Sequence, residues 1–170
     1  MFASLQQAAD SGYSRIANFQ QNAFWDDVKD QAQFISITNL VDKNARPCVY
    51  DEKYARFDFW LGHWEVYGNL QKEGPKYGHN FIEKSQNGCL LTEHWTGTSG
   101  STGASMNYYD GTLGSWVQHW VSASGISINY AGDIQNGSMI LSGKIFYINA
   151  EQDPIRDFRG TWTPLKDGVV

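Results

Sequence analysis

The segment FDFWLGHWEV, residues 57–66, contains four aromatic side chains and one glycine within ten positions. A short aromatic coil here precedes a Gly-x-Trp step, Gly62-His63-Trp64, and the chain then continues into a run with strand character. The frequencies of glycine and tryptophan change sharply at this segment. Only one of the 17 glycines stands before residue 56, and six of the seven tryptophans stand after it. The segment therefore marks the start of a glycine- and tryptophan-rich domain.

We place the domain boundary between Cys48 and Phe57, which gives a mainly helical N-terminal arm, residues 1–47, and a β-barrel domain, residues 48–170. In the arm, apolar residues recur at three- and four-residue steps between Tyr13 and Val28, a spacing that predicts an amphipathic helix. A second apolar element follows at residues 34–41. Its β-branched content leaves helix and strand both open, and we expect the arm to pack or cover rather than to carry chemistry.

After residue 57, turn signals fall about every dozen residues. Asn-Gly and Asp-Gly pairs, such as Asn136-Gly137, suit the positive φ angles of tight hairpins. The fold class is therefore mainly β, an antiparallel meander of about eight strands forming a barrel or a strongly curled sheet, with a sandwich as the alternative. The predicted strands are Trp64–Asn69, Tyr77–Glu83, Leu90–Thr96, Ala104–Tyr109, Trp116–Val121, Ser127–Gly132, Met139–Tyr147 and Ile155–Thr163.

Charge and hydropathy exclude two classes of partner. Thirteen basic and eighteen acidic residues give a formal charge of −5 and a pI near 5.2, which argues against binding to nucleic acid. No run of about 18 apolar residues is present, so we expect no membrane span. The first twenty residues have neither the basic start nor the apolar run of a secretory signal, which favours the cytoplasm unless such a signal has been removed.

Five motifs resemble an uncharacterised bacterial family of lipocalin-like, calycin-type barrel domains. They are Phe-Asp-Phe-Trp-Leu-Gly-x-Trp at 57–64, Gly-Cys-Leu-Leu-x-Glu-x-Trp at 88–95, Gly-x-Ser-x-Asn-x-Tyr-Asp at 103–110, Trp-x-Gln-x-Trp-Val at 116–121 and Thr-Trp-Thr-Pro-Leu at 161–165. The resemblance covers residues 46–170. It implies a barrel in which a tryptophan plugs one end, and it carries no assigned activity. Related barrels, including the haem-binding nitrobindins, generally hold small hydrophobic or aromatic molecules.

The resemblance also implies two more strands after the turn at Asp167-Gly168, where this chain ends at Val170. We expect the open barrel edge to be covered by the N-terminal arm, by a second copy of the chain, giving a homodimer, or by further residues.

In the same family, exported members carry cysteines at the positions of Cys48 and Cys89. This implies a disulfide, and with it a periplasmic or secreted location. Two separate free thiols are the alternative.

Strand alternation sorts the polar and aromatic side chains into faces. We expect Ser105, Asn107, Tyr109, Gln118 and Trp120 to point inward and, with Trp64, to form a ligand-binding pocket. The alternative has these residues facing solvent, with the valines filling the interior.

No catalytic or metal-binding constellation stands out. The four histidines lie on different predicted strands without metal spacing, and nitrobindins place their axial histidine near the C-terminus, where this chain has none. We therefore expect no metal or cofactor, and we identify no catalytic residues.

The function that the sequence favours is binding of a small apolar or aromatic ligand inside the barrel. One alternative is an enzyme, an isomerase, cyclase or hydrolase, with Glu93, His94 or Tyr109 as the first candidates for acid–base chemistry. The other alternative is a protein-interaction module that uses the open barrel edge.

Overall fold

The computed structural model describes residues 32–69, 74–168 and 170, and it divides the chain into two units with the boundary between Asp51 and Glu52. The described part of the first unit consists of helices α3 (Ala32–Ala45) and α4 (Pro47–Tyr50). The second apolar element of the sequence is thus a helix. The helix predicted between Tyr13 and Val28 lies outside the described residues, and no described helix is both long enough and apolar enough to cross a bilayer.

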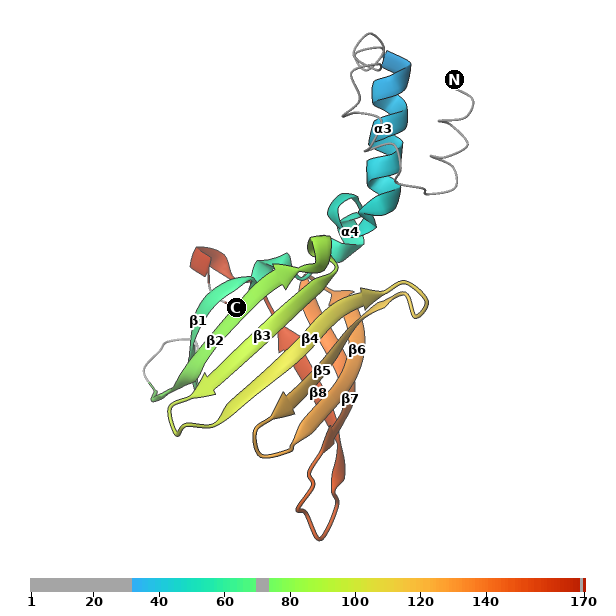
Figure 1. The fold of residues 1–170 in the computed structure, drawn as a ribbon. Helices are drawn as coiled ribbons and strands as arrows, with labels where there is room; N and C mark the ends of the chain where they lie inside the picture. The colour runs from blue at the N-terminus through green and yellow to red at the C-terminus, as the bar shows by residue number, and fades with distance from the viewer. Residues whose placement is uncertain (1–31, 70–73, 169) are drawn as a thin grey trace. The chain divides into compact units, whose positions relative to one another are not determined.

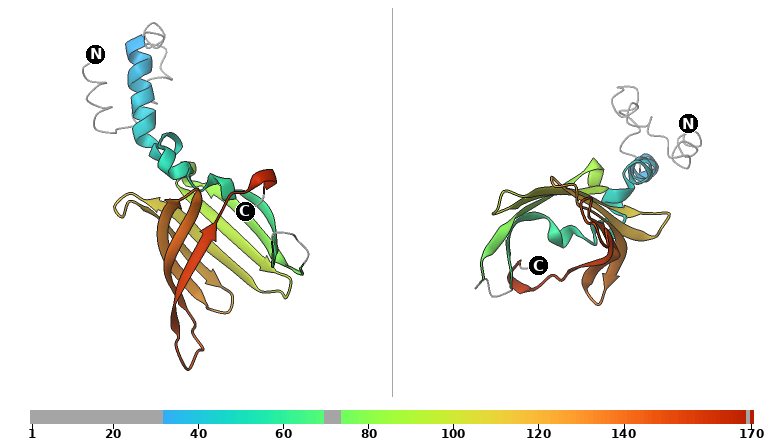
Figure 2. Two further views of the ribbon diagram at one scale, coloured as in Figure 1. Left: turned by 180° about the vertical axis from the view of Figure 1, so that it is seen from behind. Right: turned by 90° about the horizontal axis from the view of Figure 1, so that it is seen from below.

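The second unit is a single antiparallel sheet of eight strands in meander order (Figure 1). Each strand pairs with the next along the chain, which confirms the predicted mainly β meander and shows that the sandwich alternative was wrong. Figure 2 shows that the sheet curls into a half-barrel in which β1 and β8 are the two edges. The strands are β1 (Gly62–Tyr67), β2 (Lys76–Ser85), β3 (Leu90–Gly97), β4 (Thr102–Asp110), β5 (Ser115–Ser122), β6 (Ser127–Gln135), β7 (Ser138–Phe146) and β8 (Ile155–Trp162).

Short turns set the register of the sheet, as the hairpin between β6 and β7 shows. Gln135 pairs with Ser138, so only Asn136 and Gly137 form the loop. Their φ angles of 51° and 80° are both positive, as a type I′ turn requires. The Asn-Gly pair therefore joins the two strands in the way that its sequence predicts.

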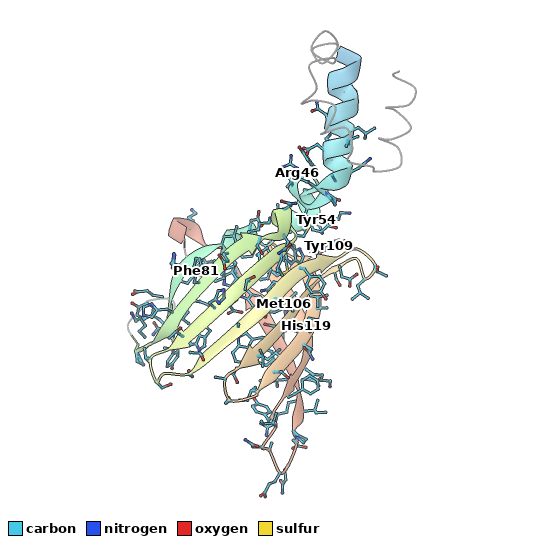
Figure 3. All side chains as sticks on the ribbon, in the orientation of Figure 1. Arg46, Tyr54, Phe81, Met106, Tyr109 and His119 are labelled. Carbon is cyan, nitrogen blue, oxygen red and sulfur yellow. The ribbon has the colours of Figure 1, made fainter. Side chains whose placement is uncertain are left out.

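Successive side chains alternate between the concave and the convex face of the sheet. On β4 and β5, Ser105, Asn107 and Gln118 are at most 2% exposed, whereas Met106, between Ser105 and Asn107, is 53% exposed. Met106 and His119 lie on this outer face (Figure 3). The interior of the half-barrel is thus lined by the polar residues of these strands as well as by apolar ones.

Two 3₁₀ helices, η2 (Glu52–Ala55) and η3 (Asp58–Trp60), close one end of the half-barrel, and Phe57 between them is fully buried. The Phe57 ring stacks on Trp60 at a centroid distance of 5.0 Å and makes edge contacts with Trp116 at 5.6 Å and Trp162 at 5.2 Å. We call these four residues the aromatic plug. It ties the segment before β1 to strands β5 and β8.

Hydrogen bonds hold residues 52–60, the segment of η2 and η3, to three strands. Trp64 Nε1 on β1 donates to the carbonyl oxygen of Trp60 at 2.7 Å, and Trp116 Nε1 on β5 donates to that of Lys53 at 3.2 Å. Lys84 Nζ on β2 donates to both carboxylate oxygens of Asp58, at 2.6 and 2.8 Å. The plug is therefore fixed in orientation as well as packed.

Phe57→Ala is expected to lower the free energy of unfolding by about 3–5 kcal/mol, because it removes the ring around which the plug packs and leaves a cavity. Urea denaturation followed by tryptophan fluorescence measures this loss. The control is Leu113→Ala, since Leu113 is 66% exposed and its truncation should cost less than about 0.5 kcal/mol. Equal effects of the two substitutions would show that the plug does not hold the fold together.

Candidate functional site

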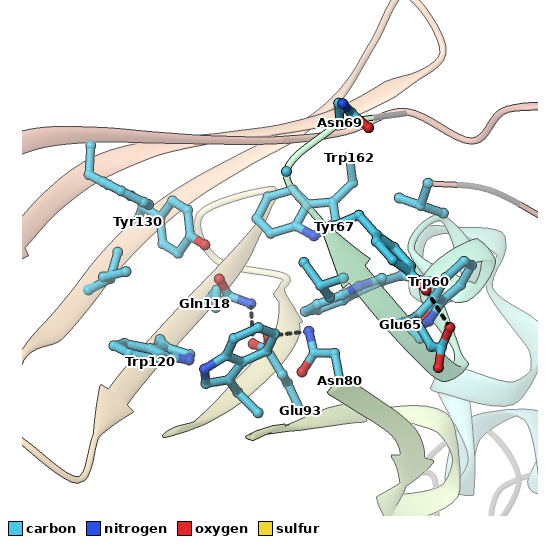
Figure 4. Close-up of a pocket in the computed structure, with 17 residues that line it drawn as sticks. Trp60, Glu65, Tyr67, Asn69, Asn80, Glu93, Gln118, Trp120, Tyr130 and Trp162 are labelled. Carbon is cyan, nitrogen blue, oxygen red and sulfur yellow. Dashed lines mark hydrogen bonds between the residues drawn. The ribbon is translucent and has the colours of Figure 1, made fainter. Parts of the chain in front are cut away.

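The concave face of the sheet lines an open cavity of about 640 Å³, within the size range of small-molecule sites (Figure 4). Five tryptophans line it, from the plug and from four strands: Trp60, Trp64, Trp95, Trp120 and Trp162. Tyr67, Tyr130 and Phe158 add further rings, and Val66, Ile128 and Val170 add aliphatic surface. The walls are thus mainly aromatic, and the plug forms one end of the cavity.

Two glycines make room for these large rings. A Cβ atom at Gly78 would lie 2.6 Å from the Trp95 ring, and one at Gly103 would lie 2.4 Å from the Trp120 ring. Each indole therefore lies against strand backbone where a side chain would otherwise stand. The space that the missing side chains leave lets the rings line the cavity instead of filling it.

A layer of buried polar side chains, centred on Glu93, lies beside the aromatic walls. Asn80 Nδ2 donates to Glu93 Oε1 at 2.7 Å, and Ser105 Oγ donates to Glu93 Oε2 at 2.6 Å. Gln118 Nε2 lies 3.4 Å from the same Oε2 and donates to Ser105 Oγ at 3.1 Å. Asn107 completes the layer by donating to Ser105 Oγ at 2.9 Å. These bonds tie together side chains from β2, β3, β4 and β5.

Glu93 is 8% exposed, and the hydrogen-bond partners of its carboxylate within the described chain are neutral. No Lys, Arg or His of the described ranges forms an ion pair with it. Burial raises the pKa of Glu93 above its ordinary value, and the hydrogen bonds from Ser105 and Asn80 offset this only in part. Among the residues that the structure describes, no basic side chain therefore pairs with this buried acidic group.

Tyr130 presents its phenol to the same cavity (Figure 4). Burial, and to a smaller extent the charge of Glu93, raise the pKa of Tyr130 far above its ordinary range. The phenol therefore stays protonated at physiological pH and is available as a neutral hydrogen-bonding group.

The second acidic residue of the cavity lining, Glu65, has a different environment at the rim. Tyr67 OH donates to Glu65 Oε2 at 2.8 Å, and Lys76 Nζ donates to Oε1 at 3.0 Å. The hydrogen bond from Tyr67 and that from Lys76 lower the pKa of this exposed carboxyl. Glu65 is therefore ionised and paired, in contrast to Glu93.

The six ligand-binding residues expected from the sequence occupy three kinds of position. Trp64, Gln118 and Trp120 line the cavity. Ser105 and Asn107 are buried in the polar layer, where they orient Glu93 and Gln118. Tyr109 is half-buried away from this lining and packs edge-on against Tyr54 at 5.5 Å. Their role in binding a ligand stays a prediction.

Sequence reasoning named Glu93 only as a candidate for acid–base chemistry in the enzyme alternative, and it did not place Asn80, Trp95, Tyr130 and Trp162 in the site. A signal for Glu93 was available, because it alternates with Leu91 and Trp95 along one strand and therefore shares their inward face. The structure pairs Glu93 with Ser105 on β4 and pairs Asn80 with Trp95. This register, which sequence alone did not supply, brings the residues together.

The histidines on strands β3 and β5 lie outside the cavity. His94 is exposed, with its ring 6.1 Å from that of Phe81 and its Nε2 3.4 Å from Glu83 Oε1. His119 is exposed as well, and its Nδ1 lies 2.8 Å from Asn129 Oδ1. Within the part of the chain that the structure describes, no group of three or more His, Cys, Asp or Glu side chains is arranged to hold a metal ion. Glu93 and His94 thus point to opposite faces and cannot act together on one ligand.

Neither Cys48 nor Cys89 is a free thiol. That the two form a disulfide with each other stays a prediction.

Comparisons with known proteins leave the family open. No family model matches the chain, and no curated protein matches it. The structure is compatible with a lipocalin-like fold at the level of an eight-stranded, antiparallel, curled half-barrel.

Glu93→Gln is expected to become more stable relative to the unsubstituted protein as pH rises. Because folding raises the pKa of Glu93, the stabilisation linked to its protonated form is fully present below about pH 4.5, the ordinary value, and is lost as pH rises through the folded-state pKa. A neutral glutamine side chain at this position avoids that loss. Urea unfolding of both proteins between pH 4 and pH 8 measures the difference.

The matched control for this titration is Glu151→Gln, which removes the same charge from an exposed loop. It separates the effect of net charge from that of burial. If the stability difference between Glu93→Gln and the unsubstituted protein stays constant or falls with rising pH, burial does not raise the pKa of Glu93.

Proposed function

We propose that this protein binds a small apolar or aromatic ligand in the half-barrel cavity. The observation that carries the proposal is a cavity of about 640 Å³ with five tryptophans in its walls and a buried polar layer beside them. Small-molecule sites generally combine apolar walls with a few fixed polar groups. The cavity has both parts, and each is built from residues on several strands.

Buried aromatic area would supply most of the affinity, at roughly 25 cal/mol per Å² of apolar surface removed from water. Gln118 and Tyr130, with fixed amide and phenol groups at the cavity surface, would set the orientation of the ligand. Ser105 and Asn107 would act one layer behind, since their hydrogen bonds hold the Gln118 amide in place. The expected binding residues thus divide into contacting and positioning groups.

The proposed function also includes a family and a cellular location for the protein. The motifs at 57–64, 88–95, 103–110, 116–121 and 161–165 support membership of the bacterial lipocalin-like family, with nitrobindin-like barrels as distant relatives. A disulfide between Cys48 and Cys89 would place the protein in an oxidising compartment. There it would serve as a carrier or receptor for its ligand.

Acid–base catalysis is the second candidate, and one observation favours it. Burial raises the pKa of Glu93 at the cavity surface, as is typical of carboxyl groups that transfer protons near neutral pH. Binding requires only the accepting carboxylate and the shaped cavity, whereas catalysis also requires a reacting group on the ligand. We therefore rank binding first.

The neutral fluorophore N-phenyl-1-naphthylamine is expected to bind the protein with enhanced, blue-shifted emission. Gly103→Ala should weaken this binding about tenfold, equivalent to about 1.4 kcal/mol, because the added methyl group displaces the Trp120 ring toward the cavity. Fluorescence titration gives both affinities, and far-UV circular dichroism checks the fold of each variant.

Gly111→Ala is the matched control, since a Cβ atom at Gly111 meets nothing within 4 Å. It should bind the fluorophore with the affinity of the unsubstituted protein. Absence of binding by the unsubstituted protein, or equal binding by both variants, would contradict a ligand site between the tryptophans.

A further inference from the structure

A purely apolar ligand in the cavity would form no hydrogen bond or ion pair with Glu93. Its carboxylate is buried, it lines the cavity, and the donors that reach it are neutral amides and a hydroxyl. A buried charge without an opposite charge is costly, and that cost falls when a bound group supplies the opposite charge. This residue therefore limits the chemistry of the ligand.

We propose that the ligand is an organic cation, an aromatic or arylalkyl primary amine whose ammonium group binds Glu93 while its ring lies among the tryptophans. This inference rests on the proposed function, because it names the ligand class of the same cavity. Three features of the site support it: the charges of its lining, the nature of its walls and an unsatisfied acceptor beside Glu93.

The charges of the lining favour a cation. Among the described residues that line the cavity, the charged side chains are Glu65 and Glu93, and none is basic. Lys76 already neutralises Glu65 at the rim, which leaves the charge of Glu93. A carboxylate ligand would meet repulsion from Glu93, and a neutral ligand would leave this charge unpaired.

The aromatic walls favour the same class of ligand. The faces of indole rings attract cations, and tryptophan does so more strongly than tyrosine or phenylalanine. Trp120 and the plug residues Trp60 and Trp162 surround the polar layer in the close-up of the cavity (Figure 4). An ammonium group that enters between these rings loses water but gains both the carboxylate and the indole faces.

Asn80 supplies a second acceptor next to Glu93. Its Nδ2 donates to Glu93, and its Oδ1 is the one buried side-chain oxygen or nitrogen atom of the described residues without a hydrogen-bond partner. Asn80 is itself 9% exposed and lines the cavity. A primary ammonium carries three N–H donors, so it has donors for Asn80 as well as for Glu93.

Three indoles that differ in one terminal group test the proposal: tryptamine, 3-propylindole and indole-3-propionate. Each is titrated by isothermal calorimetry into the protein at neutral pH. We expect tryptamine to bind roughly ten- to one hundred-fold more tightly than 3-propylindole, the range typical of a charge-assisted hydrogen bond, and indole-3-propionate to bind most weakly. Glu93→Gln should abolish the preference for tryptamine while 3-propylindole still binds.

Glu83→Gln is the matched control variant. Glu83 lies on the outer face of β2 with a side chain that is 52% exposed, so the substitution removes one negative charge from the same part of the sheet without touching the cavity. It should keep the preference for tryptamine. Retained binding of 3-propylindole by Glu93→Gln shows that the variant is folded.

The possible failures are distinguishable. If 3-propylindole and tryptamine bind the unsubstituted protein equally, or if Glu93→Gln keeps the preference, the amine inference is overturned while the proposed function stands. If tryptamine, 3-propylindole and the neutral naphthylamine fluorophore all fail to bind, both the proposed function and the amine inference are overturned.

Discussion

The contact between Trp60 and the two edges of the sheet is the constraint on which this half-barrel depends. Strands β1 and β8 are the ends of the meander, so no ladder of backbone hydrogen bonds joins them. Trp60 connects them instead: its carbonyl oxygen accepts a hydrogen bond from Trp64 on β1, and its ring lies 5.4 Å from that of Trp162 on β8. Phe57 packs against both Trp60 and Trp162, and the curl of the sheet is thereby fixed from inside.

The same plug defines the cavity, because one of its faces is the cavity end. Beyond it, the interior is kept hollow by large rings that lie against glycine backbone, as Trp120 does at Gly103. A hollow interior lowers stability, since voids forfeit packing contacts. Burying Glu93 with no basic partner among the described residues lowers stability further. Both destabilising features, the void and the buried carboxylate, occur in the cavity. Features that lower stability are expected at functional sites.

Much of the fold was predictable from the sequence because it depends on local signals. The Asn136-Gly137 turn and the regular spacing of strand segments predicted the antiparallel meander, which the structure confirms. The composition change before residue 57 predicted a domain boundary between Cys48 and Phe57, which stays a prediction. The choice between barrel and sandwich could not be made from local signals, because a curled sheet and two packed sheets use the same turns. It required the pairing of the strands.

The candidate site was predictable only in part. Alternation placed Asn107 and Gln118 on one face, yet which of the inward residues contact the cavity depends on register between strands. That register sets Glu93 opposite Ser105 and leaves Tyr109 beside Tyr54. The sequence also does not show whether a basic side chain faces a buried carboxylate, because residues that are close along the chain can point to opposite faces of the sheet.

A crystal structure of the protein with 5-bromotryptamine tests whether the aromatic cavity and the buried Glu93 carboxylate together bind a ligand. The anomalous difference map identifies the bromine atom by element, without the ligand being included in the refined coordinates. We expect a bromine peak among Trp95, Trp120 and Trp162, with the ammonium nitrogen within hydrogen-bonding distance of the Glu93 carboxylate. Bromine found only on the convex face, or an interior filled by side chains, would contradict it.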